Sequence, residues 1–235
     1  GDRLARIAAP LLVDQSIGVH VTLLRIAVRA GAGPFAEKLA SVMQQLLPEA
    51  SPSDTVQALD ELVQGGFHLE IAASTLPKVL TTAPFEQVAS VVAGLGEHGI
   101  ADASLCASAT FLGGASASSM EALTPATLLR LTVAATKSTV VAETTLDSVA
   151  AAAATTLPGW TTDDISKLLL AVAKAKGGVT GAGVACLYEC AAQVVPAKLK
   201  EMSSPQLIKV VLAVSRVPAC MPLLQAAAAE AQSRV

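Results

Sequence analysis

The stretch Ile165-Ser166-Lys167-Leu168-Leu169-Leu170-Ala171-Val172 decides the fold class of this 235-residue chain. Its apolar positions 0, +3, +4 and +7 carry Ile165, Leu168, Leu169 and Val172, and this is the spacing of one face of an α-helix. The same frame recurs around Val88 and around Leu207, and the related segments around Leu128 and Leu207 also continue with alanine. We therefore interpret the stretch as one copy of an internal helical repeat.

Working outward from this stretch, the repeat extends over the whole chain. Its anchor residues are spaced by 33, 32, 40, 37 and 42 residues, and they are Leu23, Val56, Val88, Leu128, Ile165 and Leu207. Glycine-rich breaks follow several of these segments, and a second helical run then begins; the second runs are Leu69–Leu80, Ala103–Leu112, Val140–Ala154, Val184–Val195 and Leu223–Ala231. The unit is thus a helix–turn–helix pair of roughly 32–42 residues.

A helix pair of this length cannot cover its own apolar face, but stacked neighbours can. The sequence therefore predicts an all-α fold, an α-solenoid of about five to six helix–turn–helix repeats that forms a single array over residues 1–235. An irregular all-α domain with coincidental spacing is the alternative that the variable repeat lengths leave open.

Helix starts are marked by a hydroxyl residue before proline, since such a side chain caps the first turn and proline is tolerated there. The predicted caps are Ser51 before Pro52, Thr124 before Pro125, and Ser204 before Pro205. Thr162 before Asp163 is predicted to act in the same way without a proline.

Composition excludes several classes of protein. Hydrophobic residues make up 52% of the chain and the net charge is only −3, which is unlike a disordered protein. No purely apolar run approaches the ~20 residues of a membrane-spanning helix, so no membrane span is expected. Four cysteines are too few for a disulfide scaffold of this length, and we predict that they are small buried apolar residues. They are Cys106, Cys186, Cys190 and Cys220.

Motifs that carry chemistry are lacking. The chain has no GxSxG sequence, and its most glycine-rich stretch, 176–183, lacks the GK[ST] ending of a phosphate-binding loop. Cys186 and Cys190 share a helix face, but His20, His68 and His98 lie far upstream, so no metal-binding set is apparent. The expectation is a protein that is not an enzyme, with no catalytic residue, cofactor, metal or small-molecule substrate.

A row of basic residues is the feature with the clearest functional meaning. Positions +2 and +9 after the anchor are basic in each of the last three repeats, and they hold Arg130, Lys137, Lys167, Lys174, Lys209 and Arg216. Both positions lie opposite the apolar face, so stacking would place these cations along one surface. Such a row could follow a nucleic-acid backbone and is our candidate nucleic-acid-binding site. A solvated face without a ligand and a site for an acidic protein partner are the two alternatives.

The segments around Leu128, Ile165 and Leu207 carry a family resemblance. A degenerate helical-pair repeat filled with leucine and alanine resembles the organellar helical-repeat proteins. These include the octotricopeptide and heptatricopeptide repeat families and the FAST-kinase-like proteins that end in a RAP domain. The stretch Leu157-Pro158-Gly159-Trp160 weakly resembles the Pro-Pro-Pro-Glu-Trp stretch of the octotricopeptide type. The resemblance implies an RNA-associated or assembly role in mitochondria or plastids.

Together these observations lead to one functional hypothesis and one alternative. The hypothesis is a non-catalytic, mitochondrial helical-repeat subunit of a large RNA–protein assembly, similar to a mitochondrial ribosome. It would contact rRNA-like RNA through the basic row and neighbouring proteins through apolar ends, namely Ala5, Ile7, Ala8, Leu11 and Leu12 at one end and Leu223, Leu224 and Ala226–Ala229 at the other. The alternative is a protein–protein scaffold, or an accessory subunit of a respiratory or ATP-synthase complex, without RNA contact.

Overall fold

The computed structural model describes residues 15–100, 103–175 and 181–234. Within these ranges the chain forms thirteen α-helices and five short 3-10 helices, and it contains no strand. The predicted all-α fold class is therefore confirmed. The residues Ala5 to Leu12 of the predicted apolar N-terminal end lie outside the described ranges.

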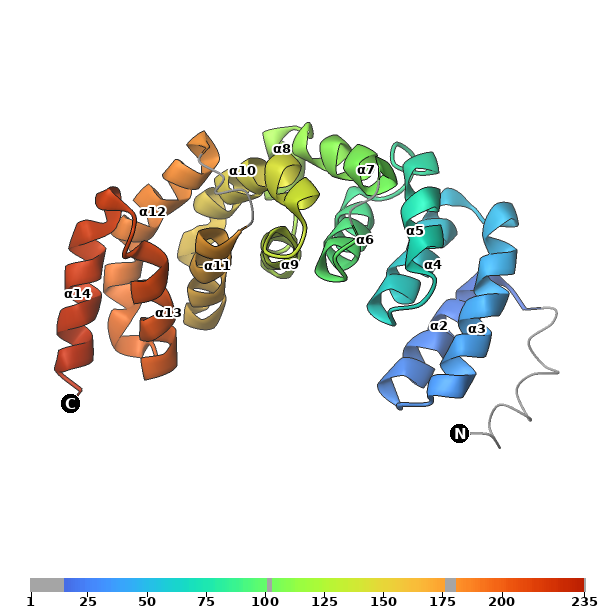
Figure 1. Ribbon diagram of the computed structural model, residues 1–235, viewed down its shortest axis with the longest axis horizontal. Helices are drawn as coiled ribbons and strands as arrows, with labels where there is room; N and C mark the ends of the chain where they lie inside the picture. The colour runs from blue at the N-terminus through green and yellow to red at the C-terminus, as the bar shows by residue number, and fades with distance from the viewer. Residues whose placement is uncertain (1–14, 101–102, 176–180, 235) are drawn as a thin grey trace.

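The helices form a curved, elongated array in which each pair follows the previous one (Figure 1). One helix of each pair lies on the inner side of the arch. These inner helices are α2 (Ile17–Arg29), α4 (Pro52–Gln64), α6 (Phe85–Glu97), α9 (Pro125–Ala135), α11 (Thr162–Lys174) and α13 (Ser204–Val214).

The partner helix of each pair lies on the outer side of the arch in Figure 1. These outer helices are α3 (Gly33–Leu46), α5 (Leu69–Thr75), α7 (Ala103–Gly113), α10 (Thr139–Thr156), α12 (Ala182–Lys198) and α14 (Met221–Gln232). A short helix, α8 (Ala117–Glu121), precedes α9. The five predicted second runs correspond to α5, α7, α10, α12 and α14, whereas α3 and α8 were not among the predicted helices.

Neighbouring pairs share one continuous apolar core. Each inner helix packs against the inner helix of the next pair, and from α5 onward the outer helices do the same. The core residues are almost all leucine, valine, alanine and methionine, with Leu24 of α2 and Leu223 of α14 near its two ends. Since no single pair encloses this core, burial of apolar surface couples each pair to the next.

Two of the four predicted helix caps are confirmed. The side-chain oxygens of Ser51 and Thr124 accept hydrogen bonds from the backbone N–H groups of Asp54 and Thr127. The other two predictions were wrong by one residue. Thr161, and not Thr162, caps α11, and Ser203, and not Ser204, is the capping residue of α13.

The shift at α13 has a local physical reason. The Gln206 side chain accepts a hydrogen bond from the Ser203 backbone N–H at 2.8 Å, which fixes Ser203 just outside the helix. At α11 the Thr161 hydroxyl oxygen accepts from the Asp164 N–H at 3.2 Å in the same way. A hydroxyl residue one position earlier therefore competes successfully for each capping position.

The caps reveal the structural register of the repeat. Val88, Leu128, Ile165 and Leu207 each lie four residues after the capping residue of their helix, and all four are buried. In the first two pairs the anchors lie at different positions, because Leu23 follows Ser16 by seven residues and Val56 follows Ser51 by five. Position numbers below count from the capping residue, so Leu207 occupies position 4 of α13.

Two glycines allow the closest approach between inner helices. A Cβ atom on Gly94 of α6 would collide with the Val63 side chain of α4. A Cβ atom on Gly96 would lie 2.8 Å from the Cβ atom of Ala134 in α9. Glycine is therefore needed on both sides of α6, and these contacts identify which positions of an inner helix face the next pair.

The prediction that all four cysteines are buried was wrong. Cys220 is buried and Cys190 is half-buried, but Cys106 and Cys186 are exposed. Alanine-rich outer helices present several small residues to solvent, so a small apolar side chain there does not report burial. The sulfhydryl groups of Cys190 and Cys220 donate to the backbone carbonyls of Ala154 and Tyr188.

Candidate functional site

The inner helices of the first four pairs are joined by a network of polar side chains. Arg25 of α2 donates from Nε to Glu61 Oε1 of α4 at 2.7 Å. Asp60 of α4 accepts from the Ser90 hydroxyl of α6 at 2.7 Å, and Ser90 accepts from Arg130 Nη1 of α9 at 2.8 Å. These contacts connect residues 30 to 40 positions apart in the chain, so they link one pair to the next.

Glu97, at the end of α6, receives two of the predicted RNA-binding cations. Arg130 Nη2 lies 3.5 Å from its carboxylate oxygen Oε2, and Lys137 Nζ donates to its backbone carbonyl at 2.8 Å. The structure thus brings Arg130 and Lys137 together at the joint between α6 and α9. Both cations hold neighbouring pairs together, and Arg130 faces in-chain acids.

Burial sets the protonation behaviour of this network. Desolvation raises the pKa of the Asp60 carboxyl above its ordinary value, and the hydrogen bond from Ser90 and the charge of Arg130 oppose that rise. At the next contact, the hydrogen bond and charge of Glu61 raise the pKa of Arg25. The network is therefore arranged around charged partners within the chain.

The next two predicted cations lie where α11 meets α13. Lys167 forms an ion pair with Asp163 one turn earlier in α11. The hydrogen bond from Lys167 lowers the pKa of Asp163, and the charge of Lys209 in α13 acts in the same direction. Both partners of this ion pair are largely exposed, so the pair contributes little to stability.

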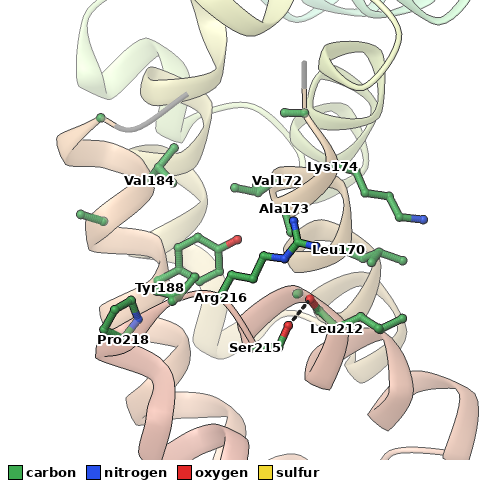
Figure 2. Close-up of a pocket in the computed structure, with 15 residues that line it drawn as sticks. Leu170, Val172, Ala173, Lys174, Val184, Tyr188, Leu212, Ser215, Arg216 and Pro218 are labelled. Atoms are coloured by element: carbon green, nitrogen blue, oxygen red, sulfur yellow. Dashed lines mark hydrogen bonds between the residues drawn. The ribbon is translucent and has the colours of Figure 1, made fainter. Parts of the chain in front are cut away.

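The last two predicted cations, Lys174 and Arg216, are exposed and line one cavity of about 600 Å³. The cavity lies between α11, α12 and the end of α13, and its other walls include Leu170, Tyr188 and Leu212. Figure 2 shows Arg216 extending toward α11 with Tyr188 beside it, whereas Lys174, Leu170 and Leu212 point away from Tyr188. Burial raises the pKa of Tyr188 to about 12, so its hydroxyl stays protonated near neutral pH.

Large apolar side chains that remain exposed are confined to the two ends of the described array. They are Val19, Ile26 and Val28 on α2, Ile208 and Leu212 on α13, and Met221 on α14. Ile208 and Leu212 are 59% and 58% exposed, and Leu212 also lines the cavity beside Arg216. An apolar surface next to exposed cations is typical of a protein-binding site.

Of the C-terminal residues predicted to form an apolar end, Leu223 and Ala227 are instead buried in the core. Ile208 and Leu212 were missed as candidate surface residues, and the buried Tyr188 was missed as a wall of the cavity. Ile208 and Leu212 have an apolar pattern like that of the buried positions in other repeats, and only their place in the last inner helix distinguishes them. That place was the one signal in the sequence that could have identified them.

Metal-binding clusters and membrane-spanning helices are absent from the described residues. The described residues contain no group of three or more His, Cys, Asp or Glu side chains that could hold a metal ion. None of the helices in these ranges is long and apolar enough to cross a membrane. Comparison with known proteins found no matching family model, no matching curated protein and no matching solved structure.

Proposed function

We propose that this chain is an α-solenoid that serves as a non-catalytic structural subunit of a larger assembly. The ordered packing of inner helix on inner helix and the curved array in Figure 1 support the solenoid description. The polar contacts that link successive inner helices, such as Arg25 to Glu61 and Arg130 to Ser90, support it as well.

One observation carries the assembly role: every large apolar side chain that the described residues expose lies on the first or the last helix pair. Between these ends each apolar face is covered by the next pair. Burying an isoleucine or leucine side chain yields about 1.5–3 kcal/mol, so these exposed side chains favour association with other proteins. Both ends of the array are thus docking surfaces in this proposal.

RNA contact is the second candidate function, and the exposure of Lys174 and Arg216 favours it. With Lys209 they give the C-terminal pairs three cations that could face phosphates in an organellar, mitochondrial-ribosome-like particle. Arg130 and Lys137 contribute less, since they hold the joint between α6 and α9, and Lys167 pairs with Asp163. The geometry therefore favours the scaffold over the RNA-binding subunit, and the mitochondrial location rests on the family resemblance alone.

Sedimentation of the native protein tests both candidates together. A lysate of the source cells is divided, one half is treated with nuclease, and both halves are run on density gradients. The scaffold proposal predicts that the protein sediments with a large particle in both halves. If nuclease releases the protein from the particle, RNA contact becomes the favoured function. A protein that sediments as a free monomer in both halves would contradict the assembly role itself.

A further inference from the structure

Three contacts define the side of an inner helix that faces the next pair. Asp60 at position 9 of α4 accepts from Ser90 of the next inner helix, and Val63 at position 12 lies against Gly94. In α6, Gly96 at position 12 lies against Ala134 of α9. Positions 5, 9 and 12 share one helix face because they are four and three residues apart.

The same positions change their exposure at the end of the array. Ala89 and Ala93, at positions 5 and 9 of α6, are fully buried beneath the next pair. The equivalent residues of α13 are Ile208 and Leu212, which are 59% and 58% exposed. The helix α13 therefore presents two large apolar residues to solvent at the positions that are buried in α6.

The charge at position 13 differs between α6 and α13. Glu97 occupies position 13 of α6, and Arg130 at position 6 of the next inner helix pairs with it. The residue at position 13 after the α13 cap is Arg216, and residues 202–229 include Lys209 and Arg216 but no aspartate or glutamate. A helix that docks here as α9 docks on α6 would need an acidic residue opposite Arg216.

We propose that α13 is the docking site for an acidic amphipathic helix of a partner protein, which covers Ile208 and Leu212 and places carboxylates against Arg216 and Lys209. This inference rests on the proposed assembly role and names the chemistry of the partner at one end.

A second copy of this chain is a poorer occupant of the site. The inner helix at the other end of the described array, α2, carries the exposed Arg29, and its Arg25 pairs with Glu61. Docking that helix on α13, or docking α13 on another α13, would place like charges together. Like-charge contacts across an interface disfavour association by several kcal/mol, whereas carboxylates would be attracted.

Fluorescence anisotropy of the full chain tests the proposal with two dye-labelled, hydrocarbon-stapled helices of about 18 residues, a length that stapling keeps helical. In both helices, leucines at the 0, 3, 4, 7 spacing form one apolar face. The residues that flank this face are glutamate in one helix and lysine in its twin. We expect the glutamate helix to bind at least about tenfold more tightly than the lysine twin. Its affinity should fall as salt is raised, because the cations are exposed.

Three variants test whether the helices bind to α13. Arg216→Glu should weaken the glutamate helix and strengthen the lysine twin, whereas Ile208→Asp should weaken both. Arg29→Glu on α2 is the matched control, an exposed arginine at the other end of the array, and should change neither. A circular dichroism melt of each variant checks that the fold is intact.

Other outcomes overturn the proposal in distinguishable ways. If both helices bind equally well and Ile208→Asp abolishes this binding, the acidic partner is refuted. The docking end, and thus the assembly role, would remain supported. An oligouridylate of about 20 nucleotides that binds more tightly than either helix and is released by Arg216→Glu would assign the surface to RNA instead. Concentration-dependent dimerisation that Ile208→Asp abolishes would assign it to a second copy.

Discussion

The inner surface of the first four pairs and that of the last two pairs use basic residues in opposite ways. Between α2 and α9, arginines reach across to acids and a serine on the neighbouring helix, as Arg25 does to Glu61 and Arg130 to Ser90 and Glu97. Between α11 and α13, Lys167 pairs within its own helix, and Lys174 and Arg216 are exposed and line a cavity.

This difference teaches that position in the repeat does not determine what a cation does. Arg130 and Lys209 occupy the same position after their caps, and so do Lys137, Lys174 and Arg216. The N-terminal members face carboxylates or carbonyls of the preceding inner helix, which turns them into contacts between pairs. Lys174 and Arg216 make no such contact among the described residues, so the same position leaves these two cations available to a partner.

The largest expected effect comes from blocking a close joint. Gly96→Val would push a branched side chain into Ala134 and Val141, and we expect the free energy of unfolding to fall by about 3 kcal/mol. Ala173→Val, at the equivalent position 12 of α11, is the matched control, because Ala173 is exposed. Urea unfolding of both variants measures the difference; equal losses would show that the two joints are alike.

A smaller effect is expected from removing paired and unpaired cations. Arg130→Ala would remove the donor that Ser90 and Glu97 share and the charge that acts on Asp60, and we expect a loss of about 1–2 kcal/mol. Lys174→Ala should change stability by less than about 0.5 kcal/mol, since an exposed cation adds little. Thermal unfolding monitored by circular dichroism compares the two. If Lys174→Ala is destabilised as much as Arg130→Ala, the contrast between the first four pairs and the last two pairs is contradicted.

The smallest effect concerns pH. The pKa of Asp60 is raised by burial above its ordinary value of 3.8, so the folded state binds this proton more tightly than the unfolded chain. The resulting stabilisation is present at low pH and is lost as pH rises through the folded pKa. Relative to Asp60→Asn, the wild-type melting temperature should therefore decline as the pH is raised above 3.8. A melting-temperature difference independent of pH would contradict the assignment.

Local pattern in the sequence predicted the helices well. The 0, +3, +4, +7 spacing around Val88, Ile165 and Leu207 correctly identified buried faces, and the hydroxyl–proline pairs at Ser51 and Thr124 correctly identified caps. Thr161 and Ser203 shifted two helix starts by one residue, because in each case the residue one position earlier makes the capping hydrogen bond.

Contacts between pairs lay beyond that pattern. Glu97 and Arg130 are 33 residues apart, and no local spacing indicates that they meet. Whether a cation is paired depends on the facing helix, which the repeat register alone does not reveal. The exposure of Ile208 and Leu212 likewise depends on the absence of a covering pair in the described array and not on their own residue types.

Sedimentation of tagged variants in nuclease-treated lysate tests most directly the claim that the array docks partners through its ends. The variant is Ile208→Asp with Leu212→Asp, and the matched control places the same two aspartates at the exposed positions Gln193 and Ala197 of α12. The account predicts that the wild type and the control sediment with a large particle and that the α13 variant moves to the slow fractions. If the α13 variant stays with the particle as fully as the wild type does, the central claim is contradicted.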